Sequence, residues 1–162
     1  MFKYFFMNRN ILIINCLLIL SVAFSSCSLE EHDPYDLKFI HIMDKNASSI
    51  TVSSKANTIS TYNVYLSAPA SEITENVNVQ YEIIVGNGLK EGVDYKLLTA
   101  DRTLTFLPGI YDMPIRIQWI SHPVDPTKDN TLKIVLVSND KGYSIGLPGP
   151  DHNQSEFTIT KI

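Results

Sequence analysis

The chain has 162 residues, a formal net charge of −4 and two cysteines, and 44% of its residues are hydrophobic. This length corresponds to one domain with a hydrophobic core of its own. An acidic chain without a cluster of lysine and arginine is a poor nucleic-acid binder, because neutralisation of phosphates supplies most of that affinity. We therefore expect no nucleic-acid partner.

The first 26 residues have the three parts of an export signal. Lys3 and Arg9 precede an apolar stretch over residues 11–24, and two small residues follow as Ser25-Ser26. The stretch has about 14 residues, whereas a helix that spans a bilayer needs roughly 20. Residues 1–26 are therefore predicted to be a signal peptide. Its removal takes away Lys3 and Arg9, which shifts the net charge from −4 to −6.

Cys27 follows this segment directly, in the run Phe24-Ser25-Ser26-Cys27. The arrangement resembles the lipobox of bacterial lipoprotein signal peptides. The resemblance implies that the Cys27 thiol carries a lipid and that the mature protein begins there. Two other interpretations stay open, namely a plain signal peptide with a chance cysteine and a retained N-terminal anchor helix.

Residues 27–35 are predicted to be a lipidated tether, with acidic side chains at Glu30, Glu31 and Asp33. An acidic stretch after the lipid cysteine resembles the surface-export signals of Bacteroidota lipoproteins, which implies an outer-membrane protein at the cell surface. A solvated linker on a periplasm-facing protein is the alternative. Because Cys16 lies in the leader, the mature domain would have no disulfide and no cysteine metal ligand.

Residues 36–162 are predicted to be a single all-β domain. Apolar and polar residues alternate with the period of two that is typical of half-buried strands. Loop-forming residues separate these runs, and Ala70 to Glu75 is the one stretch that favours a helical turn. About seven strands with turns at this spacing predict a β-sandwich. The candidate strands lie at 37–43, 50–53, 61–67, 77–85, 103–107, 114–120, 132–137 and 157–160.

Two motifs carry a resemblance to a known family. They are G-x-D-Y at residues 92–95 and L-x-F-x-P-G at residues 104–109, with an alternating strand at 114–120 next. This order resembles Calx-beta-type β-sandwich domains and a related group of uncharacterised Bacteroidota lipoprotein domains. The resemblance spans roughly residues 59–162 and implies a single Ig-like or Calx-beta-like sandwich. The related group is often encoded with glycan-uptake machinery, which implies a role in glycan capture.

The two motifs also have a local physical meaning. Gly92 suits the entry to a turn, Asp94 can hydrogen-bond the backbone of its own turn, and Tyr95 can pack inward. The Pro108-Gly109 pair predicts a tight turn between two strands.

Some Calx-beta domains bind calcium through acidic loops. Calcium needs six to eight oxygens, usually from several converging carboxylates. Here the acidic residues of the relevant segments are scattered, at Asp94, Asp112, Asp125 and Asp129. The histidines also lack the spacing of common zinc sites. They are His32, His41, His122 and His152. We therefore expect no metal and no other cofactor.

Gly142 to Gly146 matches G-x-S-x-G, the nucleophile elbow of α/β-hydrolases, with Ser144 as the nucleophile. That motif works at a sharp turn from a strand into a helix, followed in sequence by an acid and then a histidine. The acid and histidine that follow here are the neighbours Asp151 and His152, and no helical pattern follows Ser144. A serine hydrolase is therefore the least favoured function, and we expect no enzyme.

The aromatic residues offer few candidates for a sugar-binding platform. Trp119 shares its strand face with Ile115 and Ile117, which predicts that it lies in the core. Tyr111 and Tyr143 are the aromatic candidates near loops. The sequence does not identify ligand-binding residues.

The expected function is that of a lipid-anchored cell-envelope binding or accessory module, with glycan capture or uptake as its role. Its partners would be the membrane, through the lipid, and a polysaccharide or an envelope protein. The alternative is a structural or assembly subunit of an outer-membrane or surface complex.

Overall fold

The computed structural model describes residues 36–99 and 101–162, so Cys27 and the predicted signal peptide and tether lie outside the described residues. Asp36–Ile162 is one compact unit. No helix within the two described ranges is long and apolar enough to cross a membrane. The elements are β1 (Phe39–Ile42), β2 (Ser49–Val52), β3 (Ile59–Ser67), the 3-10 turn η1 (Ala70–Glu72), β4 (Val77–Val85), β5 (Tyr95–Leu97), β6 (Thr103–Phe106), β7 (Asp112–Trp119), β8 (Thr131–Asn139), β9 (Ser144–Ile145) and β10 (Glu156–Lys161).

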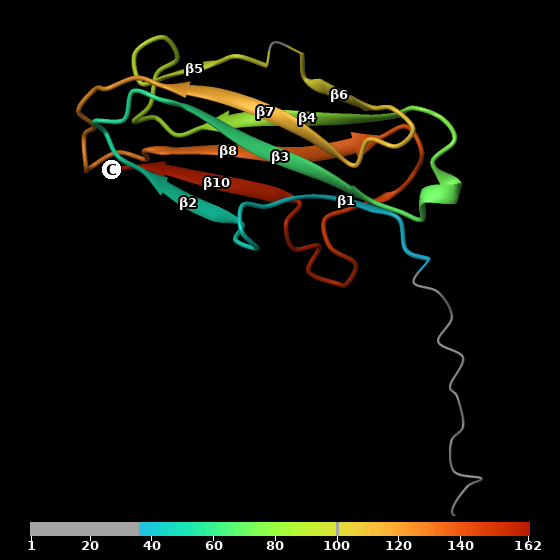
Figure 1. Cartoon of the computed structure of the whole chain (residues 1–162). Coiled ribbons are helices and arrows are strands. Elements are labelled where there is room, and N and C mark those ends of the chain that lie inside the picture. The colour runs from blue at the N-terminus through green and yellow to red at the C-terminus, as the bar shows by residue number, and fades with distance from the viewer. Residues whose placement is uncertain (1–35, 100) are drawn as a thin grey trace, which may run out of the picture. The chain divides into compact units, whose positions relative to one another are not determined.

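The strands form two five-stranded sheets that pack face to face (Figure 1). The first sheet has the order β5-β7-β3-β1-β9, and the second has the order β2-β10-β8-β4-β6. Most neighbours are antiparallel, whereas β1 pairs with β9 and β2 pairs with β10 in parallel. The first two strands and the last two strands of the chain are therefore neighbours in both sheets.

The all-β sandwich predicted from the alternation is confirmed, but the predicted number of about seven strands is wrong, because the described residues contain ten. Strands β5 and β9 have three and two residues, which is too short for a period of two to be recognised. The helical turn expected after Ala70 is present as η1. The segment 132–137 was expected to be a central strand, and β8 occupies the middle of the second sheet.

The core lies between the sheets and is built from the inward residues of the long strands. Ile115, Ile117 and Trp119 of β7 are fully buried, as their shared face predicts. The indole Nε1 of Trp119 donates a hydrogen bond of 3.2 Å to the hydroxyl of Tyr62 on β3, so its one polar group is satisfied.

Strand β3 runs from one end of the sandwich to the other, and three loops lie at each end. At one end the chain enters at Asp36, Phe39 pairs with Ser67, and Leu66 N–H donates to Tyr111 O. We call it the tether end, after the tether that the sequence predicts before Asp36, and its loops are 68–76, 107–111 and 140–143. We call the opposite end the far end, where β10 finishes (Figure 1). Its loops are 53–58, 86–94 and 120–130.

Candidate functional site

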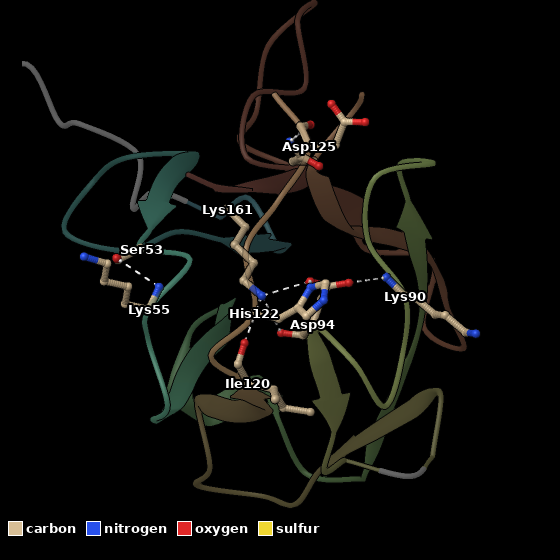
Figure 2. A network of polar contacts seen from close by, with 9 residues as sticks. Ser53, Lys55, Lys90, Asp94, Ile120, His122, Asp125 and Lys161 are labelled. Carbon is tan, nitrogen blue, oxygen red and sulfur yellow. Dashed lines mark hydrogen bonds and ion pairs between the residues drawn. The ribbon is translucent and has the colours of Figure 1, made fainter. Parts of the chain in front are cut away.

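A buried lysine dominates the far end. Lys161, on β10, has 0% exposure. Its Nζ donates to Asp94 Oδ1 at 3.0 Å, to the Asp94 carbonyl oxygen at 3.2 Å and to the Ile120 carbonyl oxygen at 2.9 Å (Figure 2). An ammonium group has three N–H donors, so this set of oxygens satisfies all of them.

The Asp94 carboxylate is held by its own turn and by two side chains. Gly92 adopts a φ of +83°, which lets the chain turn back so that Lys90 N–H donates to Asp94 Oδ2 at 2.9 Å. The ring Nδ1 of His122 lies 3.0 Å from Asp94 Oδ1. Asp94 is 3% exposed and Tyr95 is buried beside it, so the roles expected for both residues of the G-x-D-Y motif are confirmed.

This network ties the two sheets together. Lys161 belongs to the second sheet, whereas Asp94 precedes β5 and Ile120 follows β7, both in the first sheet. A charged pair inside a sandwich is costly unless both partners are hydrogen-bonded, and here both are. The network therefore acts as an electrostatic cross-link between the sheets.

The network around Asp94 and Lys161 makes the stability of the domain depend on pH. Burial raises the pKa of Asp94, but the hydrogen bonds from Lys90 N–H, Lys161 and His122 outweigh it and hold that pKa below its usual range. A carboxylate with a lowered pKa contributes stability that is present above its unfolded-state pKa of about 3.9 and is lost as the pH falls through the folded value.

We therefore expect acidification below about pH 4 to destabilise the protein partly through Asp94. Asp94→Asn keeps an acceptor for Lys90 N–H but cannot titrate, so its stability should fall less steeply with acid than that of the natural protein. Urea unfolding at a series of pH values measures both slopes. Equal slopes in the two proteins would contradict a role for Asp94.

Of the four acidic residues expected to be scattered, Asp94, Asp125 and Asp129 lie in the far-end loops. Asp112 lies at the tether end, and Asp125 accepts hydrogen bonds from the backbone and hydroxyl of Thr127. Asp129 likewise accepts from Thr131. Within 36–99 and 101–162 there is no group of three histidine, cysteine, aspartate or glutamate side chains that could hold a metal ion.

Sequence reasoning missed Lys161 and considered His122 only as one of four histidines that lack the spacing of a zinc site. A signal for Lys161 was present, because Phe157 and Ile159 alternate inward and the same period places residue 161 on the inner face. No local pattern relates His122 to Asp94, because they lie 28 positions apart in the sequence and only the fold brings them together.

The G-x-S-x-G motif lies in a different setting from a nucleophile elbow. Ser144 begins β9, which pairs in parallel with β1, and its N–H donates to Lys38 O. The ring Nδ1 of His152 contacts Ile145 O at 3.2 Å instead of the Ser144 hydroxyl. The strand continues into a turn, so the geometry gives Ser144 the role of an edge-strand residue.

The described residues form several open grooves, and two of these are lined by both polar and apolar side chains. One, of about 400 Å³, lies on the second sheet and is lined by Gln80, Tyr81, Glu82, Ile83, Arg102, Thr103 and Val137. The other, of about 590 Å³, lies at the far end beside Lys161, where Pro123, Val124, Pro126 and Ile162 are among its lining residues. Tyr111 and Tyr143 line neither groove, and both pack partly against the core.

No protein-family model and no curated protein matches the chain. A solved structure of CBD12 from CALX1.2, a Calx-beta protein, is similar, with a TM-score of 0.55 and 19% sequence identity over 76% of this chain and 43% of that one. A protein of unknown function from Bacteroides ovatus has a TM-score of 0.46 and 14% identity, over 76% of this chain and 46% of that one. The chain therefore spans less than half the length of these structures. At this level of identity the likeness to CBD12 shows the fold alone, which is a Calx-beta-like β-sandwich.

Proposed function

We propose that the protein is a Bacteroidota-type lipoprotein, held at the outer membrane by Cys27, whose β-sandwich serves as a binding module of the cell envelope. The observation that supports the anchoring is the position of Cys27, directly after the predicted export signal and nine residues before the compact unit begins at Asp36. A segment of this length with acidic residues suits a tether between a lipid and a folded domain.

The groove on the second sheet supports a glycan as the ligand class. Gln80, Glu82, Arg102 and Thr103 surround the apolar side chain of Val137, and all five are exposed. Polar groups that converge around an apolar patch suit a ligand with many hydroxyl groups and apolar C–H faces. Arg102 also lies over the ring of the buried Tyr81, at 5.8 Å, which restrains its side chain.

The anchor is tested by labelling cells with a lipid precursor. The natural protein should incorporate the label and Cys27→Ala should lose it completely, because the thiol is the acceptor. Protease treatment of intact cells then distinguishes a surface protein, which is digested, from a periplasm-facing one. Label retained in Cys27→Ala would overturn the anchor.

The groove is tested by affinity electrophoresis in gels that contain envelope and dietary polysaccharides. We expect one polysaccharide to retard the natural protein and Arg102→Ala to weaken that retardation roughly tenfold, as expected for loss of one charged hydrogen-bonding contact. Lys55→Ala, an exposed change at the far end, is the control. If no polysaccharide retards the protein, the glycan version of the proposal fails.

A second candidate function, as a subunit of an envelope assembly, is favoured by strand β2. Among the described strands it is at the edge of the second sheet and pairs with β10 alone, and its Ile50 side chain is exposed. An exposed edge of this kind can accept a strand from another protein. Crosslinking in whole cells through a photoreactive residue at position 51 separates the two functions, since a protein adduct supports assembly.

A further inference from the structure

The turn between β6 and β7 presents two apolar side chains to solvent at the tether end. Leu107 is 52% exposed and Ile110 is 43% exposed. Ile110 N–H donates to Leu107 O at 2.9 Å and Gly109 has a φ of +86°, which together with Pro108 make a tight type II turn. The turn therefore holds both side chains outward on a rigid support.

The turn is fixed to the body of the sandwich on both sides. Phe106, directly before it, is fully buried, and Tyr111, directly after it, packs partly on the core. The Tyr111 carbonyl accepts the N–H of Leu66 on β3. The exposure of Leu107 and Ile110 is thus a property of the fold and does not depend on a loose loop.

The two lysines at this end are both in ion pairs, and the acidic residues Asp36, Asp112 and Asp140 lie there as well. Lys38 forms an ion pair with Glu72, and Lys141 forms one with Glu75. With both lysines paired, attraction to anionic phosphates has little part at this end. The turn can therefore bind a partner mainly through its apolar side chains.

The length of chain between Cys27 and the sandwich limits how far this turn can lie from the proposed lipid anchor. Asp36 lies nine positions after Cys27, and a fully extended chain of that length reaches at most about 30 Å. Phe39 on β1 pairs with Ser67 on β3, and Tyr111, directly before β7, accepts a hydrogen bond from Leu66 on β3, so the backbones of Phe39 and Tyr111 are about 10 Å apart. Leu37, beside the entry point, is exposed as well.

We propose that Leu107 and Ile110 form a membrane-contact tip that inserts into the lipid surface and orients the anchored sandwich with its far end outward. The partner that the tip contacts is the lipid bilayer itself. The inference rests on the proposed anchor at Cys27, because the tether is what brings the membrane to this end. Insertion of the tip would leave the grooves on the second sheet and at the far end accessible to ligands.

The test uses the full-length acylated protein in vesicles of phosphatidylethanolamine and phosphatidylglycerol. Ile110→Cys carries an environment-sensitive fluorophore, and Ile84→Cys is the matched control. Ile84 is also an exposed isoleucine, 52% exposed, but it lies near the far-end terminus of β4. We expect nitroxide lipids to quench the label at residue 110 several-fold more than the label at residue 84, and aqueous iodide to show the reverse order.

Three other outcomes would each be informative. If mass spectrometry finds no acyl chain, the anchor fails and the membrane-contact tip fails with it. If the protein is acylated and bound to vesicles but iodide quenches both labels equally, the anchor stands and the tip is overturned. If a photocrosslinker at residue 110 yields a single protein adduct in cells while the lipid quenching is absent, the turn binds a protein partner instead.

Discussion

Replacement of Lys161 by methionine is expected to lower the free energy of unfolding by about 3–5 kcal/mol. Methionine fills much of the same space, so the loss arises from the charge that remains. Asp94 would stay in the far-end core without its ammonium partner, and the carbonyl oxygens of Asp94 and Ile120 would lose a donor. Urea unfolding followed by circular dichroism measures the change.

Two variants separate this effect from the general cost of changing a lysine. Lys133→Met breaks the exposed ion pair with Glu156, also on the second sheet, and should cost at most about 1 kcal/mol. The double variant Asp94→Asn/Lys161→Met removes both charges and should recover a large part of the lost stability. A double variant no more stable than Lys161→Met would show that burial of the Asp94 charge is not the cause.

Trp119→Ala is expected to destabilise the domain by about 3–5 kcal/mol, because it empties the largest side-chain site of the core. Trp119 is fully buried and contacts the ring of Tyr95, with centroids 6.3 Å apart. The change also leaves the Tyr62 hydroxyl without its donor. Since Trp119 is the one tryptophan of the chain, the variant must be followed by circular dichroism instead of fluorescence.

Tyr62→Phe is the companion variant, because it keeps the ring and removes only the acceptor of the indole N–H. It should cost about 1–3 kcal/mol, the range for a buried donor left unsatisfied. We expect the loss of stability from Tyr62→Phe to be smaller than that from Trp119→Ala. A loss from Tyr62→Phe as large as that from Trp119→Ala would mean that the hydrogen bond, and not the packed volume, stabilises this part of the core.

Most long strands could be predicted because their inner faces repeat with a period of two. The predicted strand 77–85 coincides with β4, and the inward triad of β7 lies where its alternation placed it. The partners of each strand could not be predicted in this way. Pairing of β10 with β2 joins Thr158 to Ser49, and no local pattern relates residues that far apart.

The network around Asp94 and Lys161 could likewise be predicted only in part from the sequence. The turn around Asp94 was predictable, because glycine and aspartate have local backbone preferences that act within a few residues. The partner of the carboxylate was not, since Lys161 comes from the last strand of the other sheet. A lysine near the end of a strand is usually solvated, so its burial follows from tertiary packing and not from residue type.

The pairing of early strands with late ones has a consequence for the timing of folding. Neither sheet can complete its hydrogen bonding until β9 and β10 are available, and the lysine that links the sheets is residue 161. A chain that crosses a membrane with its N-terminus first would therefore stay unfolded until nearly all of residues 36–161 has emerged. For the export that we propose, such a delay would favour translocation, because an export channel requires an extended polypeptide and this topology would delay closure of the sandwich.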